Sequence, residues 1–113
     1  MAERIQTFRE FWPFYVGEHA HPLNRRLHFV GTTLMLLCGA AALATMHAWM
    51  VLLMPLSGYG FAWTGHFFVE KNRPATFKYP LWSLAADFVM YGKIWTGAMD
   101  AEVERALHAK AAA

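Results

Sequence analysis

The chain has 113 residues, of which 57% are hydrophobic and 16% charged, and its formal net charge is +2. Soluble domains carry about 25% charged residues, so this chain has more apolar surface than a soluble fold of its size readily buries. A charge of +2 gives no indication of nucleic-acid binding, and the single Cys38 excludes a disulfide framework. We expect one membrane-embedded helical domain over residues 1–113, with a small, very apolar soluble bundle as the alternative.

The first predicted helix covers residues 3 to about 17. Its large apolar residues recur every three or four positions and so share one helical face: Ile5, Phe8, Trp12 and Tyr15. Pro13 is expected to kink or restart this helix. Because aromatic side chains favour the headgroup level of a bilayer, this amphipathic segment is predicted to lie along a membrane surface.

An uncharged run extends from Leu27 to Val69 and has basic residues at both ends. One membrane crossing needs about 20 apolar residues. The run therefore predicts a transmembrane hairpin of two helices, at about 26–45 and 48–70, with a turn near His47. The basic residues collect at the two feet of this hairpin, which places both feet on the cytoplasmic side.

Polar residues and prolines set the expected helix ends and bends. Asn24 is expected to cap the first crossing, and Pro55 to interrupt the second and bend its axis. A third apolar helix is predicted at about 81–99. It carries Asp87 and Lys93, so it is either buried between helices or only partly inserted. The tail beyond it is predicted to be a solvated, alanine-rich helix. The expected fold class is thus all-α, a small membrane helical bundle.

Histidines gather at the basic end of the predicted hairpin. Folding the uncharged run in half brings His28 and His66 to the same depth, and His19 and His21 lie in the polar connector before the first crossing. Glu70 follows His66 by four positions, on the same helical face. Such a cluster at a membrane face predicts a metal site. Imidazole suits iron, zinc, copper or nickel, and histidine with carboxylate around open positions is typical of non-haem Fe(II) oxygenases.

Each of these residues also has a purely structural interpretation. A lone histidine at a membrane interface is more often hydrogen-bonded than metal-bound. Glu70 could pair with a basic residue of the loop that follows it. Asp87 could pair with Lys93 or Lys78, or could accept a hydrogen bond from a tyrosine or tryptophan. Arg25 and Arg26 could act only as topology signals.

Three stretches of the sequence resemble the signature blocks of one family. They are HAHPLNRRLHFVGT from His19 to Thr32, GYGFAWTGHFFVEKNRPATF from Gly58 to Phe77, and YPLWSLAADFVMYG from Tyr79 to Gly92. In this order they resemble the Mpo1-like family, named for a fungal 2-hydroxy fatty acid dioxygenase, and its short bacterial and plant members in particular.

The resemblance implies an integral membrane protein, of the bacterial inner membrane or, in a eukaryote, of the endoplasmic reticulum. It implies an Fe(2+)-dependent α-oxidation, in which a long-chain 2-hydroxy fatty acid and O2 give an acid one carbon shorter. Carried over position by position, it makes metal ligands of His19, His28 and His66. His21 stands where many eukaryotic members have another residue, so it is the weaker ligand candidate.

Other residues are expected to assist this chemistry. Glu70 and Asp87 are candidates for a fourth metal ligand or for the hydrogen-bond partner of a ligand imidazole. Arg25, or the arginine after it, is expected to attract the substrate carboxylate. The acyl chain is expected to run between helices, where Gly58, Gly60 and the bend at Pro55 leave room.

Two other classes of function remain open. A haem-binding membrane protein is one, because two level histidines on facing helices can ligate a haem from both sides. A non-catalytic membrane scaffold is the other. In each case the expected surroundings are membrane lipid, and a homo-oligomer is compatible with the sequence.

Overall fold

The computed structural model describes residues 4–112 and is entirely helical over these residues, with no strand. Its five α-helices are α1 (Phe8–Gly17), α2 (Pro22–Thr45), α3 (Leu53–Thr64), α4 (Pro80–Thr96) and α5 (Met99–Ala112). Three short segments have other helical geometry: the 3₁₀ turns η1 (Ala48–Leu52) and η3 (Ala75–Phe77), and the π-helical turn η2 (Gly65–Glu70). The predicted all-α class is therefore confirmed.

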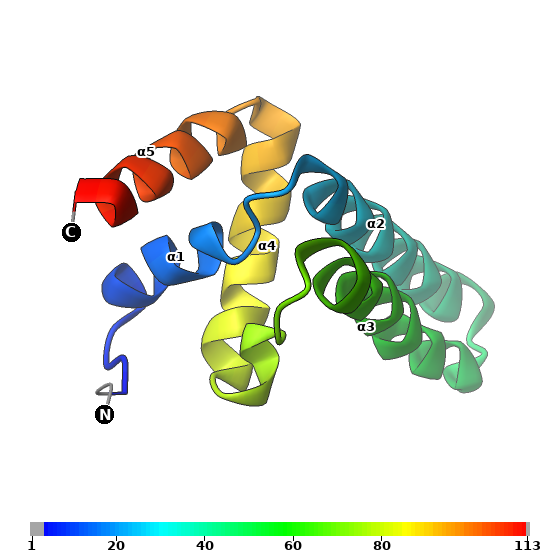
Figure 1. Cartoon of the computed structure of the whole chain (residues 1–113). Coiled ribbons are helices and arrows are strands. Elements are labelled where there is room, and N and C mark those ends of the chain that lie inside the picture. The colour runs from blue at the N-terminus through cyan, green and yellow to red at the C-terminus, as the bar shows by residue number, and fades with distance from the viewer. Residues whose placement is uncertain (1–3, 113) are drawn as a thin grey trace.

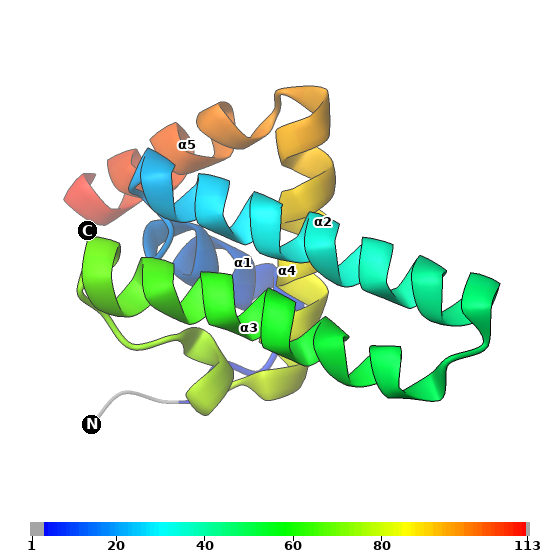
Figure 2. The same ribbon diagram turned by 90° about the vertical axis from the view of Figure 1, so that its right-hand side faces the viewer.

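The uncharged run folds back on itself at Met46, which adopts a left-handed conformation with φ 58°. α2 and α3 then run antiparallel and form a hairpin, which α4 crosses (Figures 1 and 2). The end of the hairpin that carries the turn projects beyond the other helices. Gly31 permits the close approach of the two helices. A Cβ atom there would lie 2.8 Å from Cβ of Phe61 and 3.1 Å from the carbonyl oxygen of Ser57.

α2 begins four residues before the predicted start of the first crossing. The cap is His21 and not Asn24, because Nδ1 of His21 accepts a hydrogen bond from the backbone N–H of Leu23 at 3.1 Å. Pro22 occupies the first helical position, where a missing N–H costs nothing. Asn24 is instead fully buried, inside the first turn of α2.

The second predicted crossing and the third predicted helix also have different bounds. The segment at 48–70 consists of η1, α3 and η2, and Pro55 lies in the first turn of α3, so it does not interrupt an established helix. The helix expected at 81–99 ends at Thr96, because Gly97 takes a left-handed conformation with φ 78°. Among the described residues, α2 alone is long and apolar enough to cross a membrane. Length and composition are a weak indication of a membrane span.

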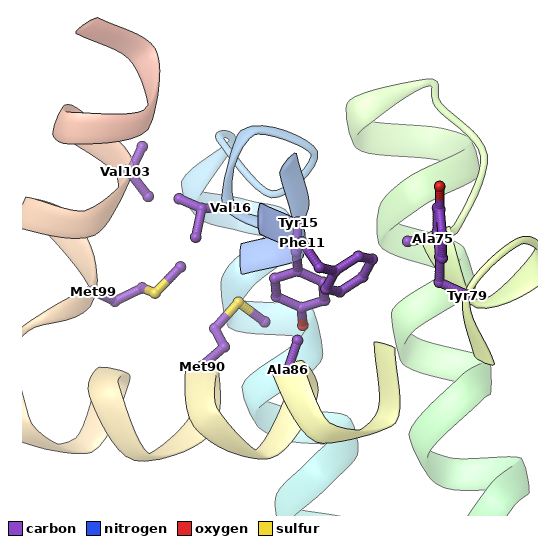
Figure 3. Packing of buried hydrophobic residues seen from close by; sticks show 9 residues of the cluster. All are labelled: Phe11, Tyr15, Val16, Ala75, Tyr79, Ala86, Met90, Met99 and Val103. Atoms are coloured by element: carbon purple, nitrogen blue, oxygen red, sulfur yellow. The ribbon is translucent and has the colours of Figure 1, made fainter. Parts of the chain in front are cut away.

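The hydrophobic core lies away from the hairpin, where α1, α4 and α5 meet (Figure 3). Phe11, Tyr15 and Val16 of α1 are almost completely buried against Met90 and other residues of α4 and α5. Of the face that the sequence predicts, Tyr15 is buried, and Ile5, Phe8 and Trp12 are partly buried against the core. The prediction that the aromatic side chains lie at the headgroup level of a membrane is therefore wrong for Tyr15, and the placement of the segment along a membrane surface stays a prediction.

Two further expectations for the ends of the chain need correction. α1 begins at Phe8 because the Thr7 side chain accepts a hydrogen bond from the Glu10 N–H at 3.2 Å, and it continues through Pro13 as one helix. Residue 3, where it was expected to begin, lies outside the described residues. The C-terminal helix α5 is only partly solvated, since Met99 and Val103 belong to the core.

Candidate metal centre

Three histidines from separate parts of the chain meet at the base of the hairpin. His19 lies in the connector between α1 and α2, His28 in the second turn of α2, and His66 at the start of η2. One ring nitrogen from each lies within 4.8 Å of the others, and all three side chains are buried. The ring centroids of His28 and His66 are 5.0 Å apart. The two histidines are therefore level with each other, as the folded hairpin predicts.

Hydrogen bonds on the outer side of two rings fix which nitrogen faces the cluster. Nδ1 of His19 lies 2.6 Å from the carbonyl oxygen of Tyr15, and Nδ1 of His66 lies 2.7 Å from the side-chain oxygen of Asn72. The amide group of Asn72 donates to the carbonyl of Glu18 at 3.1 Å, which orients its oxygen toward His66. Both oxygens only accept, so each Nδ1 carries the proton. The neutral rings therefore present unprotonated Nε2 atoms to each other.

These two Nε2 atoms, from His19 and His66, are 3.0 Å apart. With no proton between them, their lone pairs repel at this distance, whereas a cation between them would be bound by both. Metal–imidazole bonds are about 2.0–2.1 Å for zinc, so one ion would reach both atoms. The arrangement fits a metal ion better than it fits a hydrogen bond.

The third ring, that of His28, makes no hydrogen bond to any of the described residues. Its Nε2 atom is buried and has no hydrogen-bond partner among the described residues. Its Nδ1 atom lies 3.9 Å from Oδ1 of Asp87, which accepts a hydrogen bond from the hydroxyl of Tyr15. Because buried polar atoms are nearly always paired, the orphaned Nε2 atom is the natural third ligand of an ion.

Burial sets the protonation of the groups around the cluster. It lowers the pKa of His19 well below the ordinary value, and the neighbouring His28 and His66 lower that pKa further. His19 is therefore neutral at pH 7, which is the form that binds metals. Burial also raises the pKa of Asp87 to about 7, against the opposing effect of the hydrogen bond from Tyr15.

Glu70 and His21 lie beside the cluster and contribute no atom to it. Oε1 of Glu70 accepts from the backbone N–H of His21 at 2.6 Å and from the side-chain amide of Asn24 at 3.4 Å. The ring of His21 caps α2. Glu70 was expected on the same face as His66, but the i→i+5 bonding of a π-helical turn changes that register. Glu70 and His21 thus join the end of η2 to the start of α2, at the base of the hairpin.

Arg25 also supports the site from outside. Its Nη1 atom donates to the carbonyl oxygens of His19 at 2.8 Å and Ala20 at 2.7 Å, and its Nη2 atom lies 3.4 Å from Oδ1 of Asp100. It lines neither of the two cavities that border the histidines. The sequence predicts that Arg25 meets a substrate carboxylate, whereas here its guanidinium holds the connector that carries His19.

Sequence reasoning missed the two residues that orient the histidine rings. Tyr15 lies four positions before His19, one helical turn away, but its contribution through a backbone carbonyl cannot be recognised from its side chain. Asn72 gave no signal at all. The π-helical turn, followed by Lys71 in a left-handed conformation with φ 58°, returns Asn72 to His66.

Two cavities border the histidines. The inner one has about 10 Å³, room for about one water molecule or one ion, and its walls include Tyr59, Ala62 and Trp63. The outer one has about 210 Å³ and extends between α2, α3 and α4. Gly58 lines the outer cavity, whereas Gly60 faces open space. The expectation that both glycines make room is therefore right for Gly58 only.

A larger cavity, of about 600 Å³, lies elsewhere, between the start of α2 and the corner where α4 meets α5. Its lining includes Arg25, Arg26, Phe29 and Ile94, and none of the three histidines. Size alone would favour this cavity as the functional site, but the convergent ring nitrogens are the more specific chemical feature.

Three buried imidazoles could hold one metal ion, whose identity the nitrogen donors alone leave open. The family described as 2-hydroxy-palmitic acid dioxygenase Mpo1-like matches residues 5–99, a stretch that contains all three histidines, Tyr15 and Asp87. No curated protein and no solved structure matches the chain. On the strength of the family match, the chain belongs to the Mpo1-like family.

Proposed function

We propose that this protein is an Fe(2+)-dependent dioxygenase that converts long-chain 2-hydroxy fatty acids and O2 to acids one carbon shorter. The observation that carries the proposal is the pair of unprotonated Nε2 atoms of His19 and His66, 3.0 Å apart, beside the unpartnered Nε2 atom of His28. The description of the family supplies the substrate class.

His19, His28 and His66 would hold the iron, which when bound supplies the redox chemistry with O2. The protein contributes the fixed orientation of the rings. Tyr15 and Asn72 accept from Nδ1 of His19 and His66, so that both Nε2 atoms keep their lone pairs for the metal. Both hydrogen bonds lie within the protein, so the orientation of the two rings does not depend on which substrate is bound.

Asp87 is the carboxyl group next to the proposed centre in this proposal. It lies 3.9 Å from Nδ1 of His28, on the side of that ring away from its unpartnered Nε2 atom. Tyr15, which donates to Asp87, keeps the carboxyl in place. Asp87 is also the remaining candidate for a fourth ligand, because the carboxylate of Glu70 accepts a hydrogen bond from the backbone N–H of His21 instead.

The apolar surface of the hairpin supports a membrane location. Its far half exposes large apolar side chains over both helices: Leu34, Leu36, Leu37, Leu43, Met46, Trp49, Val51, Leu52 and Leu56. We infer that this half is embedded in lipid, of the bacterial inner membrane or the endoplasmic reticulum, with its base at the cytoplasmic face. Basic residues at that base, such as Arg26 and Arg73, agree with the positive-inside rule.

A haem is less compatible with the site than a single ion. The three ring centroids lie 4.4–5.0 Å from one another, and the cavity among them has about 10 Å³. A porphyrin between two of the rings would require the base of the hairpin to open. The small volume of this cavity therefore favours a non-haem ion.

The direct test is turnover by purified protein. The protein is loaded with Fe(2+), given 2-hydroxypalmitate and O2, and assayed by mass spectrometry for the acid one carbon shorter. We expect product from the unmodified protein and none from the His28→Ala, His66→Ala double variant, which should also lose stoichiometric iron. The matched control is His47→Ala, His108→Ala, which removes two exposed histidines outside the cluster.

Each failure of this test has a distinct meaning. Full activity in the His28→Ala, His66→Ala variant would remove the assigned site. A Soret band in the unmodified protein would favour a haem protein. Absence of any stoichiometric metal would favour a scaffold in which the histidines are structural.

A further inference from the structure

The outer cavity of about 210 Å³ begins at the histidines and leads away from them. On α2 its wall consists of His28, Thr32 and Met35, whose spacings of four and three place them on one helical face. On α3 the wall extends from Ala62 back to Met54, which corresponds to about 12 Å of helix. The cavity is therefore an elongated groove along the inside of the hairpin.

The chemistry of this groove changes along its length. The end at the metal cluster has the polar groups of His28 and Asp87, and the remaining lining is almost entirely apolar. Leu84 and Phe88 of α4 form one edge, and both are 43% exposed. The groove therefore has one polar end and an apolar side that opens between α4 and the hairpin.

We propose that this groove, if the proposed function holds, binds the acyl chain of the 2-hydroxy fatty acid. The head group lies at the His28 end and the chain runs toward Met54. Gly58 is the residue that keeps the middle of the groove open. A chain already in lipid gains little free energy by entering an apolar groove, so the groove acts mainly by selecting for chain shape and length.

The position of Gly58 supports this role. A Cβ atom there would lie 3.6 Å from Sδ of Met35, an ordinary van der Waals contact across the groove. An alanine would therefore fit, whereas a longer side chain would fill the groove between α2 and α3. Gly60 lies on the same helix with nothing within 4 Å of its Cβ position, so it provides a matched control.

The first experiment compares chain lengths in iron-loaded protein. Gly58→Leu should lower kcat/KM for 2-hydroxypalmitate by at least about tenfold, the scale on which pockets discriminate by shape. It should leave kcat/KM for 2-hydroxyhexanoate within about threefold of the unmodified protein, because a short chain ends before the blocked position. Gly60→Leu should change neither value, and Met35→Trp, which fills the groove from α2, should reproduce the effect of Gly58→Leu.

The second experiment does not depend on turnover. A 2-hydroxypalmitate analogue with a diazirine near the middle of its acyl chain is photolysed with the protein in lipid nanodiscs, and the labelled peptides are identified by mass spectrometry. Labelling should fall on the segments of Met35 and Met54, and should be lost in Gly58→Leu but kept in Gly60→Leu. Labelling at Phe29 and Ile94, in the 600 Å³ cavity, would overturn the proposal.

The two experiments separate failure of the groove from failure of the function. If Gly58→Leu and Met35→Trp retain iron but lose kcat/KM equally for the long and the short substrate, the acyl groove is contradicted. The proposed dioxygenase function of the unmodified protein is not affected by that result. An inactive unmodified protein whose analogue still labels Met35 and Met54 would contradict the reaction and support the groove as a lipid site. Unchanged selectivity in both variants would overturn the groove alone.

Discussion

The two ends of this molecule place their large apolar side chains differently. Where α1, α4 and α5 meet, these side chains are inside, and Phe11 and Tyr15 are 0% and 1% exposed. In the far half of the hairpin they are outside, and Leu43 and Leu56 are 79% and 69% exposed. In that half the small Ala42 is the one described residue that is buried, and the buried polar residues of α2 lie at the base of the hairpin.

In this protein the most apolar segment of the sequence is not the segment that forms the hydrophobic core. The most apolar stretch of the chain contributes few residues to the core, and the amphipathic first helix contributes much of it. Small and polar residues inside with leucine outside is the arrangement of helices that pack in lipid. We infer that the two ends of the protein are adapted to different solvents.

The largest expected effect comes from a charge on the outside of the hairpin. Leu37 is 59% exposed on α2, and replacing leucine by arginine within a bilayer costs about 3 kcal/mol. Leu37→Arg should therefore reduce the membrane-bound fraction of the protein strongly. Flotation with liposomes measures that fraction. Leu107→Arg, at a 43% exposed leucine of α5, is the control and should float as the unmodified protein does. Equal flotation of both variants would contradict a lipid-embedded hairpin.

The next effect concerns the contact between α2 and α3. Gly31→Ala would place a Cβ atom 2.8 Å from Cβ of Phe61 and 3.1–3.2 Å from two backbone oxygens, which cannot move away as a side chain can. We expect a loss of about 1–3 kcal/mol in the free energy of unfolding, measured by thermal unfolding in detergent. Gly60→Ala, in open space, should be neutral or stabilising by up to about 1 kcal/mol. An unchanged midpoint in Gly31→Ala would show that the helices are not in close contact.

A comparable effect is expected where the two ends of the molecule meet. Asp87 of α4 joins Tyr15 of the core to His28 of the hairpin. Asp87→Asn removes the carboxylate beside His28 and should lower the affinity for the metal by up to about tenfold, the low end of what residues that support metal ligands contribute. Competition with a chelator measures this affinity. Glu104→Gln, at an exposed position of α5, should leave it unchanged, and an equal affinity in Asp87→Asn would separate Asp87 from the centre.

The smallest effect is expected at the outer edge of the core. Glu102 accepts from Nε1 of Trp12 at 2.7 Å and lies near Lys93 and Arg105. The hydrogen bond from Trp12 lowers the pKa of Glu102 below 4.5, so its charge stabilises the fold above that pH and the contribution is lost as the pH falls through the lowered pKa. Glu102→Gln should destabilise the protein by about 0.5 kcal/mol at pH 7.

Thermal unfolding at two pH values tests this sign. The difference between Glu102→Gln and the unmodified protein should shrink at a pH below the lowered pKa, where the carboxyl of Glu102 is protonated. A difference that grows on acidification would contradict the assignment.

The sequence predicted the part of the fold that depends on long periodic patterns. The absence of charge from Leu27 to Val69 and the turn near His47 were enough to bring His28 and His66 together. Helix ends were less predictable because they depend on single contacts. His21 caps α2 through a ring nitrogen, a role that composition assigns more readily to Asn24.

The surroundings of the histidines were beyond the reach of sequence patterns. The metal-ligand roles of His19, His28 and His66 rest on the family resemblance and remain a proposal, but their convergence is visible in the structure. The partners of the rings come from a backbone carbonyl at Tyr15 and from Asn72, neither of which has a periodic signature. The altered place of Glu70 depends on a turn whose geometry no propensity predicts.

The π-helical turn at Gly65–Glu70 makes the protein sensitive to a change of a single residue in length. A π-helical turn contains one residue more than an α-helix would need there, and the exposed Phe67 or Phe68 is the one that a deletion would remove. The shortened chain would gain regular α-helical bonding but would carry Asn72 away from His66, which it now contacts at 2.7 Å. The additional residue of this turn therefore serves to bring Asn72 to the His66 ring, and π-helical turns of this kind are frequent at functional sites.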